Sequence, residues 1–74
     1  MKKIKITCKD DFAKLIRQSP LSVQRVSKES KVAFGSVENW LYGHSVPSLE
    51  NVCKVLNAIG YELIAVAKEN ENDV

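Results

Sequence analysis

The sequence predicts a mainly α-helical fold: one compact domain of four to five short helices, with a short β-strand at each end. The chain has 74 residues, which is the size of one small domain. Apolar residues recur at helical spacing between residues 8 and 60, and Ser, Pro and Gly separate the segments that carry this spacing. The expected organisation is therefore a strand over 1–7, a helical core over 8–60, a strand over 61–67 and a polar tail over 68–74.

The N-terminal segment has the alternation of a half-buried strand, followed by a signal for the start of a helix. Ile4 and Ile6 alternate with lysine and threonine, which predicts the first strand. Thr7 and Asp10 have the spacing of a capping box, so the first helix is expected to begin between them. The apolar residues of this helix are Phe12, Leu15 and Ile16. Ser19-Pro20 ends this helix, because the residue before a proline is disfavoured in the α conformation.

Two further short helices are separated by a tight turn. Ser22 is the expected N-cap of the second helix, which runs to about Ser30. The turn follows at 31–32, and the third helix covers about 34–42. Gly43 supplies the left-handed residue that ends the third helix. The expected core anchors of this pair of helices are Val26, Val37 and Trp40.

The fourth helix and the segment after it are both apolar, but their patterns differ. Ser48 is the expected N-cap of the fourth helix, and Gly60 ends it. Its apolar stripe consists of Leu49, Val52, Val55, Leu56 and Ile59. Residues 61–67, YELIAVA, are rich in β-forming residues and apolar in succession, a pattern that requires cover on both faces. This strand therefore needs a partner, which is either the N-terminal strand of the same chain or the same strand of a second chain.

Composition is that of a small globular domain and disfavours enzymes and membrane proteins. Apolar residues make up 45% of the chain and charged residues 27%, which is ordinary for such a domain. Cys8 and Cys53 have no second pair, so neither a disulfide scaffold nor a zinc site is expected, and no cofactor is predicted. The longest apolar run, 63–67, is too short to cross a bilayer, and the start of the chain lacks the apolar region of a signal peptide. We therefore expect a cytoplasmic protein without enzymatic activity.

The net charge of +2 is unevenly distributed along the chain. Residues 1–31 contain nine Lys or Arg and three Asp or Glu, whereas residues 32–74 contain two and six. A basic first part with an acidic second part is compatible with a nucleic-acid-binding protein whose positive side faces phosphates. Lysine is common in proteins, so this asymmetry alone supports the interpretation weakly.

The residues between Leu21 and Tyr61 follow a known order and spacing. They are Val26-Ser27, Val32, Val37, Trp40, Gly43, Pro47-Ser48-Leu49-Glu50 and Ile59-Gly60. In this pattern the segment resembles the lambda-repressor-like helix-turn-helix family, also called the Cro/cI or XRE type. It departs from the family pattern at Val23, where glutamine is common, and at Lys31, where glycine is usual. The resemblance implies a compact helix-turn-helix domain whose third helix, about 34–42, enters the major groove of DNA.

By family position, the residues that face the bases are Ala33, Phe34, Gly35, Glu38 and Asn39. Phe34 packs on a thymine methyl group or lies at the edge of the core. Asn39 pairs with adenine or holds a phosphate, and Glu38 accepts a hydrogen bond from cytosine or has a structural role. Gly35 has no side chain with which to read a base, so its expected contribution is a close approach of the backbone.

Phosphate contacts are expected at both ends of the helix-turn-helix and on the first helix. The residues concerned are Ser22, Gln24, Tyr42, His44, Ser45, Lys14 and Arg17. Ser22 and Gln24 lie at the N-terminus of the second helix, where backbone N–H groups favour anions. Lys14 and Arg17 add long-range attraction, and His44 is either a phosphate contact or an exposed residue.

Few cations flank the third helix, so tight binding to double-stranded DNA is expected to need a homodimer that occupies two half-sites of a palindromic operator. The expected dimer contacts, between antiparallel C-terminal strands, are made by Tyr61, Leu63, Ile64, Ala65 and Val66. The predicted function is that of a sequence-specific transcription regulator, either a prophage-type repressor or an antitoxin that also binds a toxin protein. The alternative is a protein-interaction module of helix-turn-helix shape with little or no DNA binding.

Overall fold

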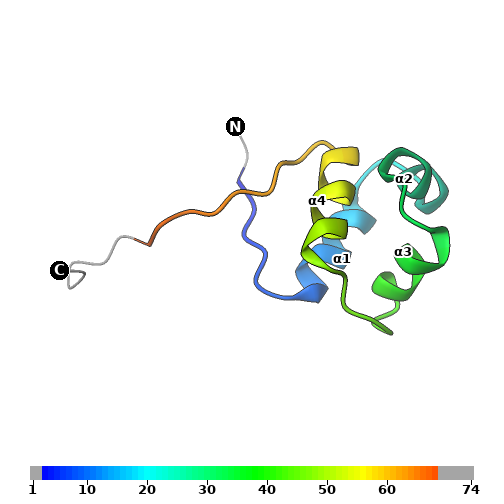
Figure 1. Cartoon of the computed structure of the whole chain (residues 1–74), viewed down its shortest axis with the longest axis horizontal. Helices are drawn as coiled ribbons and strands as arrows, with labels where there is room; N and C mark the ends of the chain where they lie inside the picture. The colour runs from blue at the N-terminus through cyan, green and yellow to red at the C-terminus, as the bar shows by residue number, and fades with distance from the viewer. Residues whose placement is uncertain (1–2, 69–74) are drawn as a thin grey trace.

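The computed structural model of the protein describes residues 3–68, which form four short α-helices joined by tight turns (Figure 1). The helices are α1 (Lys9–Gln18), α2 (Val23–Ser30), α3 (Phe34–Leu41) and α4 (Leu49–Ala58). Helix α3 packs against α1 and α2, and α4 packs against α2. The mainly helical fold predicted from the apolar spacing is confirmed. None of these four helices has the length and apolar character needed to cross a bilayer.

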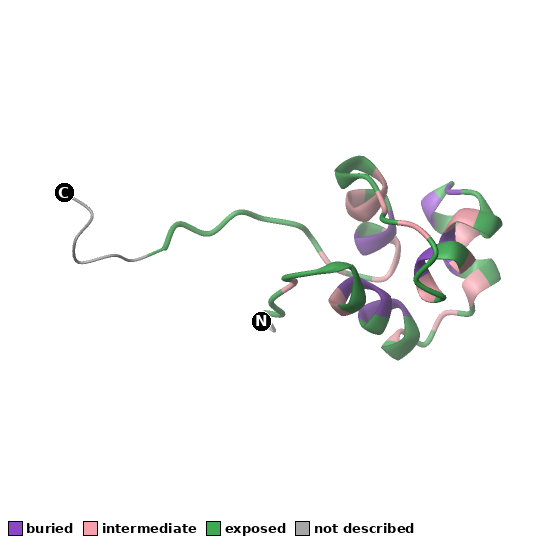
Figure 2. Ribbon diagram, turned by 90° about the horizontal axis from the view of Figure 1, so that it is seen from below, coloured by how far each residue is buried: buried purple, intermediate pink, exposed green. Residues whose placement is uncertain are grey.

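One apolar core lies where the four helices meet, and Figure 2 shows the buried faces of the helices turned toward one another. The buried apolar residues are Phe12, Ala13, Leu15, Ile16, Val26, Val32, Val37, Trp40, Val55 and Leu56. The three expected anchors of α2 and α3 are thus confirmed as core residues. The rings of Phe12 and Trp40 lie 5.9 Å apart between centroids and are tilted by 52°, a favourable arrangement for an aromatic pair. This contact joins α1 to α3.

The N-caps of α2 and α4 are formed as expected, but that of α1 is not. The hydroxyl oxygens of Ser22 and Ser48 accept hydrogen bonds from backbone N–H groups three residues later, at 3.1 and 3.2 Å. Helix α1 begins after Cys8, and the predicted capping box of Thr7 and Asp10 is wrong. The Thr7 N–H and hydroxyl instead donate to the Asp11 carboxylate at 2.8 and 2.7 Å. These two hydrogen bonds hold the pKa of the Asp11 carboxyl below its ordinary value, because they favour the ionised form.

Helices α2, α3 and α4 all end in the same backbone motif. A left-handed residue follows each helix: Lys31, with φ of 61°, directly after α2, and Gly43 and Gly60, with φ of 78° and 94°, in the second position after α3 and α4. The N–H of the next residue then donates to a carbonyl five residues earlier: Val32 to Ser27, His44 to Asn39 and Tyr61 to Leu56, at 3.2, 2.8 and 2.7 Å. These are the hydrogen bonds of a Schellman motif, which satisfies free carbonyl groups and sets the direction in which the chain leaves the helix.

Two serine hydroxyls reinforce the turn between α2 and α3. The Ser27 hydroxyl donates to the Val32 carbonyl at 2.6 Å, so Ser27 and Val32 are joined by both a backbone and a side-chain hydrogen bond. The buried Ser30 hydroxyl donates to the Val26 carbonyl at 2.6 Å. Because each of these polar groups is satisfied locally, the turn packs closely against the core at little cost in desolvation.

Replacing Lys31 with glycine is expected to raise the free energy of unfolding by about 1 kcal/mol, because only glycine adopts the left-handed conformation without a steric penalty. Urea denaturation followed by circular dichroism measures the change. The matched control is Lys28→Gly, the same replacement inside α2, where glycine disfavours the helix and is expected to destabilise by about 1 kcal/mol. A loss of stability in Lys31→Gly would contradict the assigned turn geometry.

The predicted terminal β-strands, over 1–7 and 61–67, are wrong for the described part of both segments. Residues 3–7 and 61–68 run as chain without strand pairing (Figure 1). A β-strand requires hydrogen bonds to a neighbouring strand, and these two segments do not pair with each other. Residues 1–2 of the predicted first strand, and 69–74 of the predicted polar tail, lie outside the described residues.

The apolar stripe of α4 is correct for its middle and wrong at its start. Val55 and Leu56 are buried, and Val52 and Ile59 pack against the core. Leu49, predicted to belong to the stripe, is 71% exposed. It is the first residue of α4, directly after the N-cap, whereas the buried residues of α4 lie in its later turns. Leu49 therefore remains available on the surface.

Candidate nucleic-acid interface

Helix α3 has one buried face and one exposed face. Val37 and Trp40 are buried, and residues three or four positions apart in a helix share a face. Positions 35, 38 and 39 fall on the other side of the helix, since each residue advances by about 100°, and position 34 lies at the edge between the two sides. The core contacts of Val37 and Trp40 thus fix both the place of α3 and the direction in which its outer face points.

The C-terminal end of α3 is also held by two basic side chains of α1. The Lys9 ammonium donates to the Gly43 carbonyl at 3.1 Å, and the Arg17 guanidinium donates to the Leu41 carbonyl. Carbonyl groups at the end of a helix carry partial negative charge and lack intrahelical donors, so both contacts are favourable. Sequence reasoning missed the Lys9 contact, because nothing local relates residues that are 34 positions apart.

The expected base-facing residues lie together on this outer face. Ala33, Gly35 and Asn39 are exposed, Phe34 is 39% exposed, and Glu38 is half-buried. A Cβ atom added at Gly35 would meet no atom of the chain within 4 Å. Packing within the chain therefore does not require glycine at this position. Phe34 lies at the boundary between the core and the outer face.

The expected phosphate-contacting residues are dispersed around α3. Ser22 and Gln24 are exposed at the N-terminus of α2, where the hydroxyl oxygen of Ser22 already caps the helix. Beyond α3, Tyr42 and His44 are exposed with their rings 6.2 Å apart, and Ser45 is half-buried. On α1, Lys14 is exposed, whereas Arg17 is engaged at the end of α3. Arg17 therefore supports the position of α3 whether or not it also contacts a phosphate.

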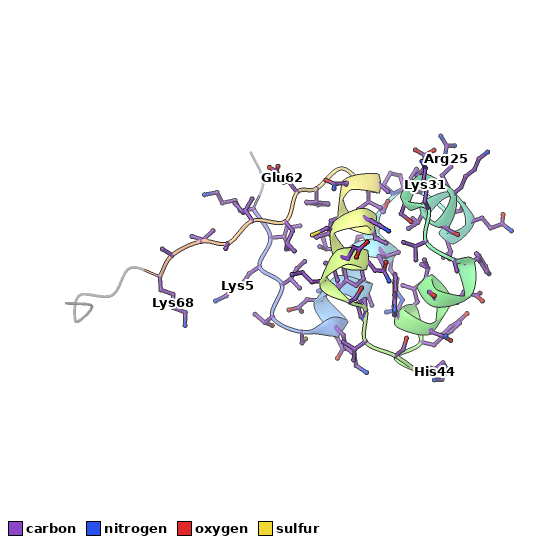
Figure 3. All side chains as sticks on the ribbon, in the orientation of Figure 1. Lys5, Arg25, Lys31, His44, Glu62 and Lys68 are labelled. Carbon is purple, nitrogen blue, oxygen red and sulfur yellow. The ribbon has the colours of Figure 1, made fainter. Side chains whose placement is uncertain are left out.

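Two cations near the start of α3 were not among the sequence-predicted residues. Lys31 lies in the turn before α3, and Arg25 lies on α2, where it pairs with Glu29 at 3.2 Å. Figure 3 shows Arg25 and Lys31 at one end of the α2–α3 unit and His44 at the other. The sequence signal for Lys31 was its departure from the glycine that is usual at this position. Both cations are exposed, and the Glu29 carboxylate offsets the charge of Arg25, so Lys31 is the unpaired cation of the two.

The expected dimer residues differ in how they are placed. Tyr61 packs against the core, and its backbone N–H donates to the Leu56 carbonyl at the end of α4, whereas Leu63, Ile64, Ala65 and Val66 are exposed. Cys8 and Cys53 are free thiols. Among residues 3–68, no three His, Cys, Asp or Glu side chains gather into a candidate metal site.

Comparisons of the chain with models of protein families, with curated proteins and with solved structures found no match. We therefore infer the function from the geometry and chemistry of these residues.

Proposed function

We propose that this protein is a sequence-specific DNA-binding transcription regulator with a lambda-repressor-like helix-turn-helix, in which α3 lies in the major groove. The observation that carries the proposal is the outer face of α3. It presents small and polar residues to solvent on a helix that the core holds in a fixed orientation. The major groove, about 12 Å wide, admits one α-helix.

The residues of this face suit close contact with a groove. Ala33 and Gly35 let the helix approach the bases, and Asn39 is able to donate to and accept from adenine. Phe34 offers an apolar contact for a thymine methyl group. Around the face, the N-terminus of α2 and the side chains of Lys31 and Arg25 favour phosphates.

A homodimer is part of the proposal. Helix α3 contains no Lys or Arg, so one copy makes few strong phosphate contacts. Two copies on one DNA site raise the affinity through effective concentration and give the operator two-fold symmetry. The residues proposed for this contact are those of the C-terminal segment, Tyr61, Leu63, Ile64, Ala65 and Val66.

The test is selection of bound fragments from random double-stranded DNA by the purified protein. The expected result is a palindromic sequence whose affinity falls by at least about 100-fold between about 50 and 200 mM salt, because binding to phosphates releases counterions. Failure to enrich any sequence, combined with an affinity that does not depend on salt, would refute the proposal.

The second candidate is a protein-interaction module of the same shape, for example an antitoxin that binds a toxin. The only charged residue of α3 is the acidic Glu38, which favours this alternative. In that case the outer face of α3 contacts a protein, and the selection yields no preferred DNA sequence.

A further inference from the structure

An open apolar groove lies on the side of the molecule where the two chain ends leave the helices. Its volume is about 290 Å³, and its apolar lining includes Ile6, Phe12, Val46, Leu49, Val52 and Leu63. Val46 and Leu49 are 73% and 71% exposed, although both are aliphatic. Adjacent exposed aliphatic side chains of this kind mark an interaction surface more often than isolated ones do.

The C-terminal arm, residues 62–68, begins in this groove and then leaves it. Leu63 lines the groove, whereas the following residues lead away from the helices (Figures 1 and 2). Ile64 and Val66 are exposed large aliphatic residues of the arm. The chain thus presents an uncovered apolar groove and an uncovered apolar arm side by side, and its own arm covers the groove only through Leu63.

We propose that a second copy of the chain covers this groove, and that two copies exchange their arms reciprocally. In the dimer, Ile64 and Val66 of each copy lie against Val46 and Leu49 of the other. This contact is isologous, as a two-fold dimer requires, because each copy supplies one arm and one groove. The inference gives a geometry to the homodimer of the proposed function and does not depend on DNA binding.

Charge favours arm exchange over direct pairing of the two arms. Residues 1–9 contain four lysines and no acidic residue, and Lys9 lines the groove. The arm itself contains one acidic residue and one lysine, and the sequence that follows it, 69–73, contains three acidic residues and no lysine. Pairing of two arms brings two such acidic sequences together, whereas exchange joins each to a copy whose groove edge carries Lys9.

The groove and the proposed DNA-contacting face do not compete for the same surface. In Figures 1 and 2 the arm extends from the side of the molecule opposite α2 and α3. A dimer formed through the groove therefore leaves the outer face of α3 uncovered in both copies.

A disulfide trap tests the arrangement, since the native Cys8 is exposed and lines the groove. The variant Ala67→Cys, with Cys53→Ser, is oxidised mildly without DNA and separated on a non-reducing gel. Arm exchange predicts a covalent dimer whose peptides link Cys8 of one chain to the introduced thiol of the other, and Cys8→Ser abolishes this dimer. A dimer linked through two introduced thiols shows arm-to-arm pairing and overturns the proposal, as does a monomer alone.

The second measurement is the dimer dissociation constant of Leu49→Glu, determined by light scattering over a range of concentrations. Glutamate is favoured in the first turn of a helix, so α4 is expected to remain folded. An unpaired carboxylate in the apolar contact weakens the dimer, and we expect its dissociation constant to rise by at least about tenfold. The control Tyr42→Glu alters a residue that is 69% exposed and outside the groove, and it should dimerise like the native chain. A Leu49→Glu variant that dimerises equally well would overturn the proposal, whatever the protein does with DNA.

Discussion

Replacing Trp40 with alanine is expected to lower the free energy of unfolding by about 3–5 kcal/mol. Trp40 is buried and contacts Phe12 of α1, so the change removes a large apolar surface and leaves a cavity between α1 and α3. A chain of 74 residues is expected to have only about 4–11 kcal/mol of stability in total. The midpoint of thermal unfolding should therefore fall by at least about 12 °C. Circular dichroism measures this without the tryptophan fluorescence that the variant lacks.

The matched control for this change is Tyr42→Ala. It truncates another aromatic side chain only two residues away, but that residue is 69% exposed. We expect the control to change the stability by no more than about 0.5 kcal/mol, as for most surface substitutions. Similar losses in the two variants would mean that Trp40 does not join α1 to α3 as described.

The helical part of the fold could be predicted because its signals are local. The spacing of Val37 and Trp40, the serine N-cap at Ser48 and the glycine end at Gly60 each depend on a few neighbouring residues. The turn at Lys31 was also predicted, although the residue there is not glycine. Hydrogen bonds from Ser27 and Val32 on either side of this residue stabilise its left-handed conformation.

The terminal segments could not be predicted in the same way, because a strand is defined by its partner. The β-forming residues from Tyr61 onward indicate a preference for extended structure, but they do not specify which strand would pair with this segment. The exposure of Leu49 has a related cause. Helical spacing places it on the apolar stripe, yet only the relative position of α2 and α4 decides how much of that stripe is covered.

The candidate site was predictable to the same limited extent. The outer face of α3 follows from the positions of Val37 and Trp40, so Gly35 and Asn39 could be placed on it from the sequence. The Lys9 and Arg17 contacts with the end of α3 could not, since both connect distant parts of the chain. Which ligand occupies the outer face is a chemical question that variants at Gly35 address directly.

Replacing Gly35 with glutamate is expected to weaken binding to the selected DNA site by at least about 100-fold while the domain stays folded. The new side chain places a negative charge in the middle of the surface proposed to face DNA, and juxtaposed like charges cost several kcal/mol. The fold should tolerate the change, because an added Cβ meets no atom within 4 Å and acidic residues are favoured in the first turn of a helix. Binding is measured by fluorescence anisotropy, and folding by urea denaturation.

Two further variants separate this effect from general consequences of the substitution. Asn57→Glu makes the same change in net charge at an exposed position of α4. It should alter DNA affinity by less than about threefold, because salt screens charges that lie more than about 10 Å from the phosphates.

Gly35→Ala should raise the stability by about 0.5–1 kcal/mol, since alanine is the better helix former. If α3 lies in a groove, the added methyl group of Gly35→Ala should nevertheless reduce the affinity, so that stability and binding change in opposite directions. Unchanged DNA affinity in Gly35→Glu would remove α3 from the DNA contact and leave protein recognition as the function of its outer face.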